Sequence, residues 1–206
     1  MINIFRITFL LSLIFTLDEG LLYDLNFRGY NAGESMLSIK KDSIDIESNY
    51  YLTSIIKTNK FLDRFYKIRD RVDVILNDED FSIIKVEKKL NQGGKKTNFT
   101  SIIDQENLTA SSNNKTISIP GRVFDPLGAI YYLRNQNIAV GDTFELTTYD
   151  NDKLKNLFIV AKDIETVSTS IGNFECIVLT PQSKDGKLLK NKGSICLLYT
   201  SPSPRD

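Results

Sequence analysis

The sequence predicts an all-β protein, built as an antiparallel, strongly curled sheet or open barrel with one short helix near residues 126–134. Apolar and polar residues alternate with a period of two over most of the chain from Leu21 onward. Turn signals rich in Gly, Asn and Asp recur between these runs. Only one segment beyond the N-terminal region has helical spacing. A two-sheet sandwich is the alternative, and the curled sheet is favoured because a single helix can cover one open end or face.

The first predicted strand carries four large residues on one face: Leu21, Tyr23, Leu25 and Phe27. Residues 29–33 supply a turn bounded by glycines, a second strand follows around 37–39, and a third spans 50–56. The clearest alternation lies in residues 66–76, where Tyr66 begins an apolar face on which Asp70 is the only charged residue. These runs predict successive antiparallel strands.

The next strands are separated by compact turns. Residues 77–80, "NDED", form a predicted turn before a strand over 84–90. The glycine pair in 91–96, "NQGGKK", is typical of a hairpin connection. A strand over 99–103 then leads into a polar loop around 111–115.

The predicted helix begins after Asp125, whose side chain can accept a hydrogen bond from a free amide of the first turn. Pro126 suits the first helical position, where its missing N–H costs nothing. One stripe at helical spacing carries Leu127, Ile130, Tyr131 and Arg134. Gly128 weakens the helix modestly.

After the helix the alternation returns. Strands are predicted over 144–148, 157–167 and 174–178, with turns at 150–152 and at Gly172. The segment "NKGSI", ending at Ile195, starts a further predicted strand.

Composition narrows the function classes. The 206 residues are 41% hydrophobic, which is enough for the core of one domain plus an exported leader. The 26 basic and 26 acidic residues cancel, so the balance favours neither nucleic acid nor an anionic membrane. Histidine is absent and the two cysteines form no CxxC pair, so we expect no metal and no cofactor.

Residues 1–20 have the layout of a signal peptide. Arg6 precedes a short apolar run, Ile7 to Leu17, that is too short to span a bilayer comfortably. A buried first helix or strand is the alternative, and no small-residue cleavage site follows the run. The pattern predicts export to the periplasm or the periplasmic face of an envelope membrane, with no transmembrane segment after cleavage.

Few residues point to chemistry. The chain has no phosphate-binding loop, no dinucleotide-binding glycine turn and no nucleophile elbow. Asp70, between Arg69 and Arg71, is either a catalytic carboxylate or, as the favoured interpretation, a structural ion-pair or strand-end residue. The "NDED" turn lacks the oxygen spacing of a calcium loop, so a solvated turn is favoured there.

The helix offers a candidate binding group. Tyr131, Tyr132 and Arg134 could gate an apolar cavity, with the arginine meeting an anionic head group. The favoured alternative is that Tyr131 packs on the sheet while Arg134 pairs with a carboxylate.

Several motifs together resemble a family of bacterial exported proteins known as domain-of-unknown-function family 3108. They are "LLYDLNFRGYNAGE" with its Ala32-Gly33 pair, "YKIRDRVDVIL", "FDPLGAIYYLRNQNIAVGDTFEL", "TSIGNFECIVLTP" and "KGSI". The resemblance covers residues 21–195. It implies an envelope protein with a β-rich fold, and it implies no reaction and no catalytic residues.

The end of the chain departs from that pattern. Residues 196–206, "CLLYTSPSPRD", resemble a translated sequencing adapter, as in a metagenomic fragment. The sequence thus predicts one β-rich domain over 21–195, truncated at its C-terminal end, and a non-native tail. Cys176 would then be a lone thiol, the strand near "KGSI" would have an unpaired edge, and Thr200 to Asp206 would pack on nothing.

The resulting hypothesis is an uncharacterised exported envelope protein that binds an amphiphilic or apolar ligand, such as a lipid, or an envelope partner, without catalysing a reaction. The predicted lining residues of a cavity in the curled sheet are Tyr23, Phe27, Tyr131 and Arg134. A structural or interaction module without a ligand cavity is the alternative. A carboxylate-based hydrolase is a third hypothesis, which requires two carboxylates converging in a cleft.

Overall fold

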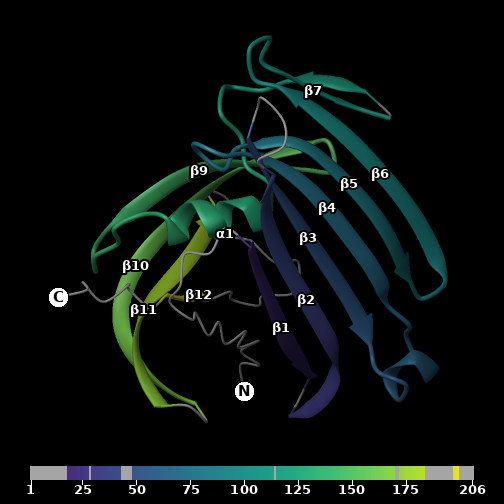
Figure 1. The fold of residues 1–206 in the computed structure, drawn as a ribbon, viewed down its shortest axis with the longest axis vertical. Coiled ribbons are helices and arrows are strands. Elements are labelled where there is room, and N and C mark those ends of the chain that lie inside the picture. The colour runs from purple at the N-terminus through teal and green to yellow at the C-terminus, as the bar shows by residue number, and fades with distance from the viewer. Residues whose placement is uncertain are drawn as a thin grey trace. The chain divides into compact units, whose positions relative to one another are not determined.

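The strands form two antiparallel sheets, accompanied by one short α-helix in the described part of the chain (Figure 1). The structure, a computed structural model, describes residues 18–27, 29–42, 48–113, 115–169, 172–183 and 197–199. Each sheet has two edge strands, so neither closes into a barrel. The predicted all-β antiparallel class with one short helix is therefore confirmed.

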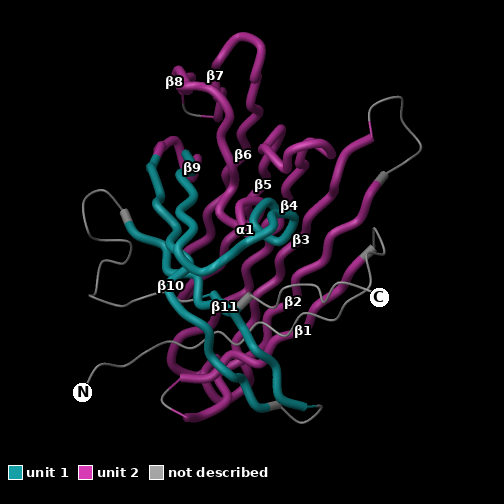
Figure 2. The backbone as a smooth tube through the Cα atoms, turned by 90° about the vertical axis from the view of Figure 1, so that its left-hand side faces the viewer, with its two compact units in different colours: residues 1–15, 132–147, 155–206 teal, residues 16–131, 148–154 magenta. Residues whose placement is uncertain are grey.

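The chain divides into two compact units, drawn in teal and magenta in Figure 2. Unit 1 contains residues 1–15, 132–147 and 155–206, and unit 2 contains residues 16–131 and 148–154. Unit 2 carries the larger, eight-stranded sheet.

The eight-stranded sheet is a meander in which each strand pairs with the next along the chain. Its strands are β1 (Asp18–Phe27), β2 (Tyr30–Asp42), β3 (Asn49–Thr58), β4 (Arg69–Asn77), β5 (Ile83–Gln92), β6 (Lys95–Asp104), β7 (Thr109–Ser112) and β8 (Thr116–Ser118). A single 3-10 turn, η1 (Leu62–Arg64), interrupts the β3–β4 connection. Because the strands alternate in direction, the β1–β2, β3–β4 and β5–β6 connections lie at one end of the sheet (Figure 1). The β4–β5 and β6–β7 turns lie at the other end.

One face of this sheet forms the core of unit 2, as period-two alternation requires. Leu52 lies opposite Ile39 on one side and Val74 on the other, and Val74 in turn faces Val86. Leu52, Val74 and Val86 are each only 1% exposed, and Leu76 is 0% exposed. Their burial is the main source of stability in this part of the fold, because each fully buried aliphatic side chain contributes about 1.5–3 kcal/mol.

Two predicted positions differ from the structure. The pairing of β1 with β2 shifts register between Leu25 and Asn26. The extra residue, Ala32, lies on β2, and Phe27 at the end of β1 is exposed whereas Leu21 and Tyr23 of the same strand are half-buried. Tyr66 lies outside β4, in the β3–β4 connection, and is also exposed.

The predicted helix forms as α1 (Pro126–Arg134). Asp125 caps it, because its Oδ1 accepts a hydrogen bond of 2.8 Å from the amide of Leu127. The packing face differs from the predicted stripe, since Gly128 and Ala129 are buried whereas Leu127 is only half-buried. Gly128 explains the difference. A Cβ at that position would lie 2.8 Å from a methyl carbon of Leu76, so the missing side chain allows the helix to approach the sheet closely.

The four-stranded sheet has the order β12-β11-β10-β9. Its strands are β9 (Thr143–Asp150), β10 (Lys153–Thr169), β11 (Gly172–Ser183) and β12 (Leu197–Tyr199). Asn151 and Asp152 have positive φ angles of 48° and 60°, as a tight hairpin turn between β9 and β10 requires. The tip of this hairpin, residues 148–154, belongs to unit 2.

A small hydrophobic cluster lies on the strands β10, β11 and β12. Cys176, Val178 and Leu198 pack together, with Val167 and Phe174 against them. Leu198 belongs to the segment that the sequence analysis assigns to a non-native tail, and within it β12 pairs with β11. The predictions for residues 1–17, for the strand near "KGSI", for Cys196 and for residues 200–206 lie outside the described residues.

Candidate functional site

Two of the predicted lining residues lie in the interior of unit 2. Tyr23 is half-buried on β1, on the strand face that also carries Glu19 and Leu21. Tyr131 of α1 is buried, and its hydroxyl donates a hydrogen bond of 3.4 Å to a carboxylate oxygen of Glu19. The structure therefore brings the helix to the β1 face that carries Tyr23.

The other two predicted lining residues, Phe27 and Arg134, do not lie in the interior of unit 2. Phe27 is 51% exposed at the end of β1. Arg134 is the last residue of α1 and belongs to unit 1. Phe27 thus belongs to the surface at one end of the sheet, where the candidate site described below is found.

A buried polar cluster lies beneath α1. Burial raises the pKa of Asp125 to about 6, while the Leu127 amide and the positive charge of Lys88 oppose the shift. Lys88 is itself buried and forms a short ion pair with Asp150. Tyr149 completes the cluster, as its hydroxyl lies 2.8 Å from the Ser101 hydroxyl.

The geometry of this cluster gives its groups structural roles. The Tyr149 hydroxyl also donates to Asp152 over 2.9 Å, and burial raises the pKa of Tyr149 to about 12. Asp125 holds the first turn of the helix, and Lys88 compensates the charge of Asp150. These contacts join β5, β6, α1 and the tip of the β9–β10 hairpin into the core of unit 2.

Asp70 has a structural role at the start of β4. It is buried, and its carboxylate accepts hydrogen bonds from the Asn91 amide over 2.9 Å and from the Gln92 side chain over 2.5 Å. The neighbouring arginines pair with other carboxylates, Arg69 with Asp63 and Arg71 with Asp73. Asp70 is therefore a strand-end residue that fixes the end of β5. No group of three or more His, Cys, Asp or Glu side chains in the described ranges could hold a metal ion.

The candidate binding surface is the end of the eight-stranded sheet that carries the β1–β2, β3–β4 and β5–β6 connections, which we call the aromatic end. The exposed aromatic side chains here are Phe27 (51%), Tyr30 (77%), Phe61 (65%), Phe65 (72%) and Tyr66 (54%). Where burial is described, only Tyr51 is an exposed aromatic residue elsewhere. Clustered exposure of large aromatic side chains marks a contact surface, because single exposed residues are common and clusters are rare.

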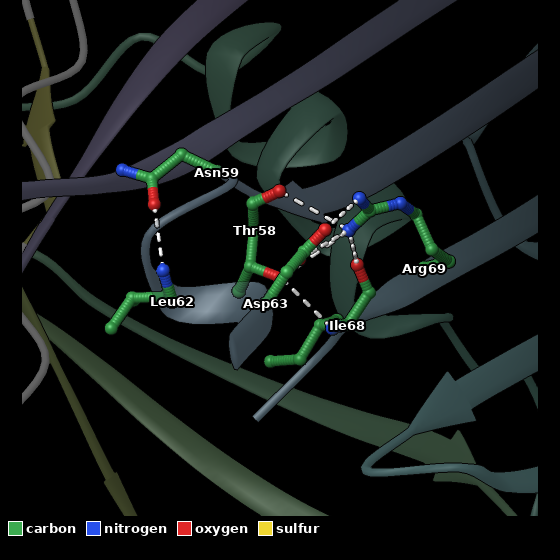
Figure 3. A network of polar contacts seen from close by, with 6 residues as sticks. All are labelled: Thr58, Asn59, Leu62, Asp63, Ile68 and Arg69. Carbon is green, nitrogen blue, oxygen red and sulfur yellow. Dashed lines mark hydrogen bonds and ion pairs between the residues drawn. The ribbon is translucent and has the colours of Figure 1, made fainter. Parts of the chain in front are cut away.

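A polar network holds the β3–β4 connection in one conformation (Figure 3). Arg69 donates two hydrogen bonds to Asp63, of 2.9 and 2.5 Å, and further hydrogen bonds to the carbonyls of Thr58 and Ile68. Asn59 accepts a hydrogen bond of 2.9 Å from the Leu62 amide, which starts the 3-10 turn. The Arg69 guanidinium and the Thr58 hydroxyl hold the pKa of Asp63 below its ordinary value.

This connection is also tied to both neighbouring turns. Its Asn59 side chain donates a 2.6 Å hydrogen bond to the Asn31 carbonyl at the start of β2. On the other side, the Gly93 amide donates to the Lys67 carbonyl over 2.8 Å. Gly93 lies under the ring of Tyr66, since a Cβ there would come within 2.6 Å of a ring carbon. The three connections are therefore braced together through their backbones, and their aromatic side chains are exposed.

Cationic residues flank these aromatic residues along the chain. The β3–β4 connection and the start of β6 carry Lys60, Arg64, Lys67, Lys95 and Lys96. No described carboxylate forms an ion pair with any of the five. Asp63, the one acidic residue between β3 and β4, is occupied by Arg69. The surface thus combines exposed rings with five cations that form no ion pair with a described carboxylate.

Sequence reasoning identified Phe27 and missed the other members of this surface. The signal was present in residues 60–67, "KFLDRFYK", where three aromatic residues alternate with cations between two strands. Assigning Tyr66 to a strand face concealed it, because that assignment implied burial. The contribution of the β1–β2 and β5–β6 turns depends on strand pairing, which places them beside this segment.

Comparison with known proteins gives a family without a described activity. No curated protein and no solved structure matches the chain. In the ranges that the structure describes, no helix is long and apolar enough to cross a membrane. One family model matches residues 22–204, which include the whole of the aromatic end. The chain belongs to the family described as "Protein of unknown function (DUF3108)".

Proposed function

We propose that this protein is a non-enzymatic binder of amphiphilic molecules, and that it binds them with the aromatic end of its eight-stranded sheet. The exposure of Phe61 and Phe65, on a connection that the Asp63–Arg69 pair holds, carries this proposal. Their rings pack edge to face, with centroids 5.7 Å apart and an interplanar angle of 64°. Together they present apolar surface that an amphiphile's hydrocarbon can cover.

Preorganisation supports binding at this surface. A connection that became ordered only on binding would lose conformational entropy at that step. Here the Arg69 and Asn59 hydrogen bonds fix the backbone before any ligand arrives. The free energy gained by burying the two phenyl rings is therefore available for affinity.

Burial at the centre of the sheet favours a surface site over the interior cavity that the sequence suggested. Leu52, Val74 and Val86 on the inner face are already almost fully buried. A ligand placed among them would have to displace packed side chains. At the aromatic end, a ligand covers side chains that now face water.

Partition onto uncharged detergent micelles tests this proposal. Pulsed-field-gradient NMR or sedimentation measures the bound fraction of the full chain on dodecyl maltoside micelles. The variant Phe61→Ser/Phe65→Ser removes two rings, each worth about 1.5 kcal/mol or more when fully buried. We expect partition to fall by about tenfold for half-burial of the rings and by about 100-fold for full burial.

The matched control removes exposed apolar surface from the outer face of the same sheet, which is the face opposite the buried core. Leu22 of β1 and Ile102 of β6 are 73% and 57% exposed, so Leu22→Ser/Ile102→Ser makes a similar change away from the aromatic end. We expect it to leave partition within about twofold. Partition that survives in the phenylalanine variant and disappears in this control would falsify the proposal. It would instead support the interaction-module alternative, with the outer face as the contact surface.

We also propose that the protein acts in the periplasm or on the periplasmic face of an envelope membrane. The signal-peptide pattern of residues 1–20 supports this location. Cell fractionation with intact-mass measurement tests it. A mature mass lacking the N-terminal segment, found in the periplasmic or membrane fraction, is expected, and an uncleaved cytoplasmic chain would contradict it.

A further inference from the structure

We infer that the aromatic end docks on the surface of an anionic lipid bilayer, with its rings in the interfacial region and its cations among the lipid head groups. This inference rests on the proposed function and names the amphiphile as a membrane surface. It concerns peripheral contact, in which the sheet meets the bilayer with its three braced connections.

Charge complementarity identifies the bilayer as anionic. Lys60, Arg64 and Lys67 flank the exposed rings within the β3–β4 connection, and Lys95 and Lys96 follow the adjoining β5–β6 turn. Each cation near an anionic surface adds to the attraction, and the attraction weakens with salt. Lysines with long apolar stems also suit this interface, because the stem can lie beside hydrocarbon while the ammonium group remains in water.

The rings have the composition of a membrane-interface group. Phe61 and Phe65 are purely apolar, whereas Tyr30 and Tyr66 carry a hydroxyl that can remain at head-group level. All four are more than half exposed. Aromatic and cationic groups thus occur together on one surface, which fits a boundary between charge and hydrocarbon better than a wholly apolar ligand.

The opposite end of the sheet gives the docking a direction. The β4–β5 turn carries Asp78, Glu79 and Asp80, and the β6–β7 connection carries Glu106. An anionic surface repels Glu79 and Glu106, which form no ion pair with a described cation, whereas Lys41 and Arg122 partly neutralise Asp78 and Asp80. Attraction at one end and repulsion at the other therefore orient the eight-stranded sheet with its aromatic end toward the bilayer.

Vesicle co-sedimentation tests the inference. The full chain is mixed with vesicles of phosphatidylcholine alone, or of phosphatidylcholine with about 30% of the anionic lipid phosphatidylglycerol. We expect at least about tenfold stronger binding to the anionic vesicles at low salt. Raising sodium chloride from about 0.05 to 0.5 M shortens the screening length and should remove most of this preference.

Charge reversal locates the contact. Lys60→Glu/Arg64→Glu/Lys95→Glu should abolish the preference for anionic vesicles. The control Lys115→Glu/Lys153→Glu/Lys162→Glu changes net charge equally at three exposed positions outside the aromatic end, and should retain most of the preference. Circular dichroism checks that both variants are folded.

The outcomes separate this inference from the proposed function. A chain that partitions onto uncharged micelles but binds both vesicle types equally retains the proposed function and refutes the anionic bilayer. Equal losses in the two charge-reversal variants refute the location, because net charge alone would then explain binding. Loss of binding in Phe61→Ser/Phe65→Ser to micelles and anionic vesicles alike supports both proposals.

Discussion

The two ends of the eight-stranded sheet differ in the exposure of their aromatic side chains and in the sign of the neighbouring charges. At the aromatic end, Phe61 and Phe65 are exposed and the surrounding charges are positive. At the opposite end, which we call the acidic end, Phe81 is buried and stacks on Tyr50, with ring centroids 4.9 Å apart. The same face of the sheet is buried along its length, but its two ends have very different surfaces.

The carboxylates at the acidic end are partly neutralised by neighbouring strands and loops. Lys41 pairs with Asp78 over 3.1 Å, and Arg122 pairs with Asp80 over 3.4 Å. The five cations of the aromatic end have no such pairs among the described residues. The aromatic end thus has the exposed rings and cations that the proposed contact requires, whereas the acidic end has paired charges and a buried ring stack.

The largest expected effect comes from Gly33→Ala at the aromatic end. A Cβ at Gly33 would lie 2.2 Å from the Lys57 carbonyl oxygen, which belongs to the backbone of the paired strand and cannot turn aside. We expect a loss of about 3 kcal/mol in the free energy of unfolding, because β2 and β3 must separate. Urea unfolding measures it. Gly20→Ala, which meets nothing within 4 Å, is the control and should cost far less.

Asp125→Asn tests the buried polar cluster beneath α1, away from the aromatic end. The folded pKa of Asp125, about 6, lies above the ordinary value of 3.8, so the folded chain binds more protons between these pH values. The wild-type free energy of unfolding therefore falls by about 3 kcal/mol as pH rises from about 4 to 6, through this group.

Asparagine keeps the oxygen that caps α1 and has no proton to lose in this range. The difference in unfolding free energy between variant and wild type should thus shift in favour of the variant as pH rises through that window. Urea titrations at pH 4 and pH 7 give this difference. A difference that is the same at both pH values would show that burial does not raise the pKa of Asp125.

Gly93→Ala perturbs the bracing of the aromatic end, with Gly94→Ala as its matched control. Both glycines have positive φ angles, 59° and 86°, so each alanine carries a backbone strain of about 1 kcal/mol. Only at Gly93 would the added methyl group also meet the Tyr66 ring. We expect Gly93→Ala to cost about 1 kcal/mol more than Gly94→Ala and to shift the Tyr66 ring resonances. Equal costs would mean that Tyr66 does not brace the β5–β6 turn.

The smallest effect is local and follows from Asp63→Asn. The Tyr66 amide donates to the Leu62 carbonyl over 2.8 Å within the connection that Asp63 and Arg69 hold. Weakening that pair should lower the protection of this amide from hydrogen exchange, with little change in global stability. Asp73→Asn removes a similar arginine pair on the outer face and should leave the Tyr66 amide unchanged.

Acid should have the same local effect on the wild type. The folded pKa of Asp63 lies below 3.8, so its contribution is fully present above that value and is lost as pH falls through the folded pKa. The excess protection of the Tyr66 amide in the wild type over Asp63→Asn should therefore shrink in strong acid. An excess that persists there would contradict the assigned role of the carboxylate.

Much of the fold could be predicted from the sequence because alternation reports directly on which strand face is buried. The strand around Val74 and the helix after Asp125 both formed where periodicity and capping placed them. Phe27 escaped the same reasoning because it is the last residue of β1, and alternation does not report how far the buried face extends along a strand. Gly128 was expected only to weaken the helix, since its contact with Leu76 depends on the packed sheet.

The candidate site was harder to predict. Tyr30 and Phe65 lie far apart in sequence, and only the meander of β1 to β4 brings their connections to one end. Net charge was also uninformative, because the 26 basic and 26 acidic residues of the whole chain cancel wherever they lie in the fold. Composition counts residues without their positions, so it cannot reveal a surface formed by the separation of charges in space.

Paramagnetic broadening by a nitroxide-labelled lipid in uncharged micelles tests the central claim most directly. In the full, ¹⁵N-labelled chain, the account predicts broadening of amides in residues 29–30, 59–68 and 92–96. It predicts unaffected amides in the acidic-end turns at 78–82 and 105–108. Equal broadening at both ends, or broadening confined to the outer-face strands around Leu22 and Ile102, would contradict it.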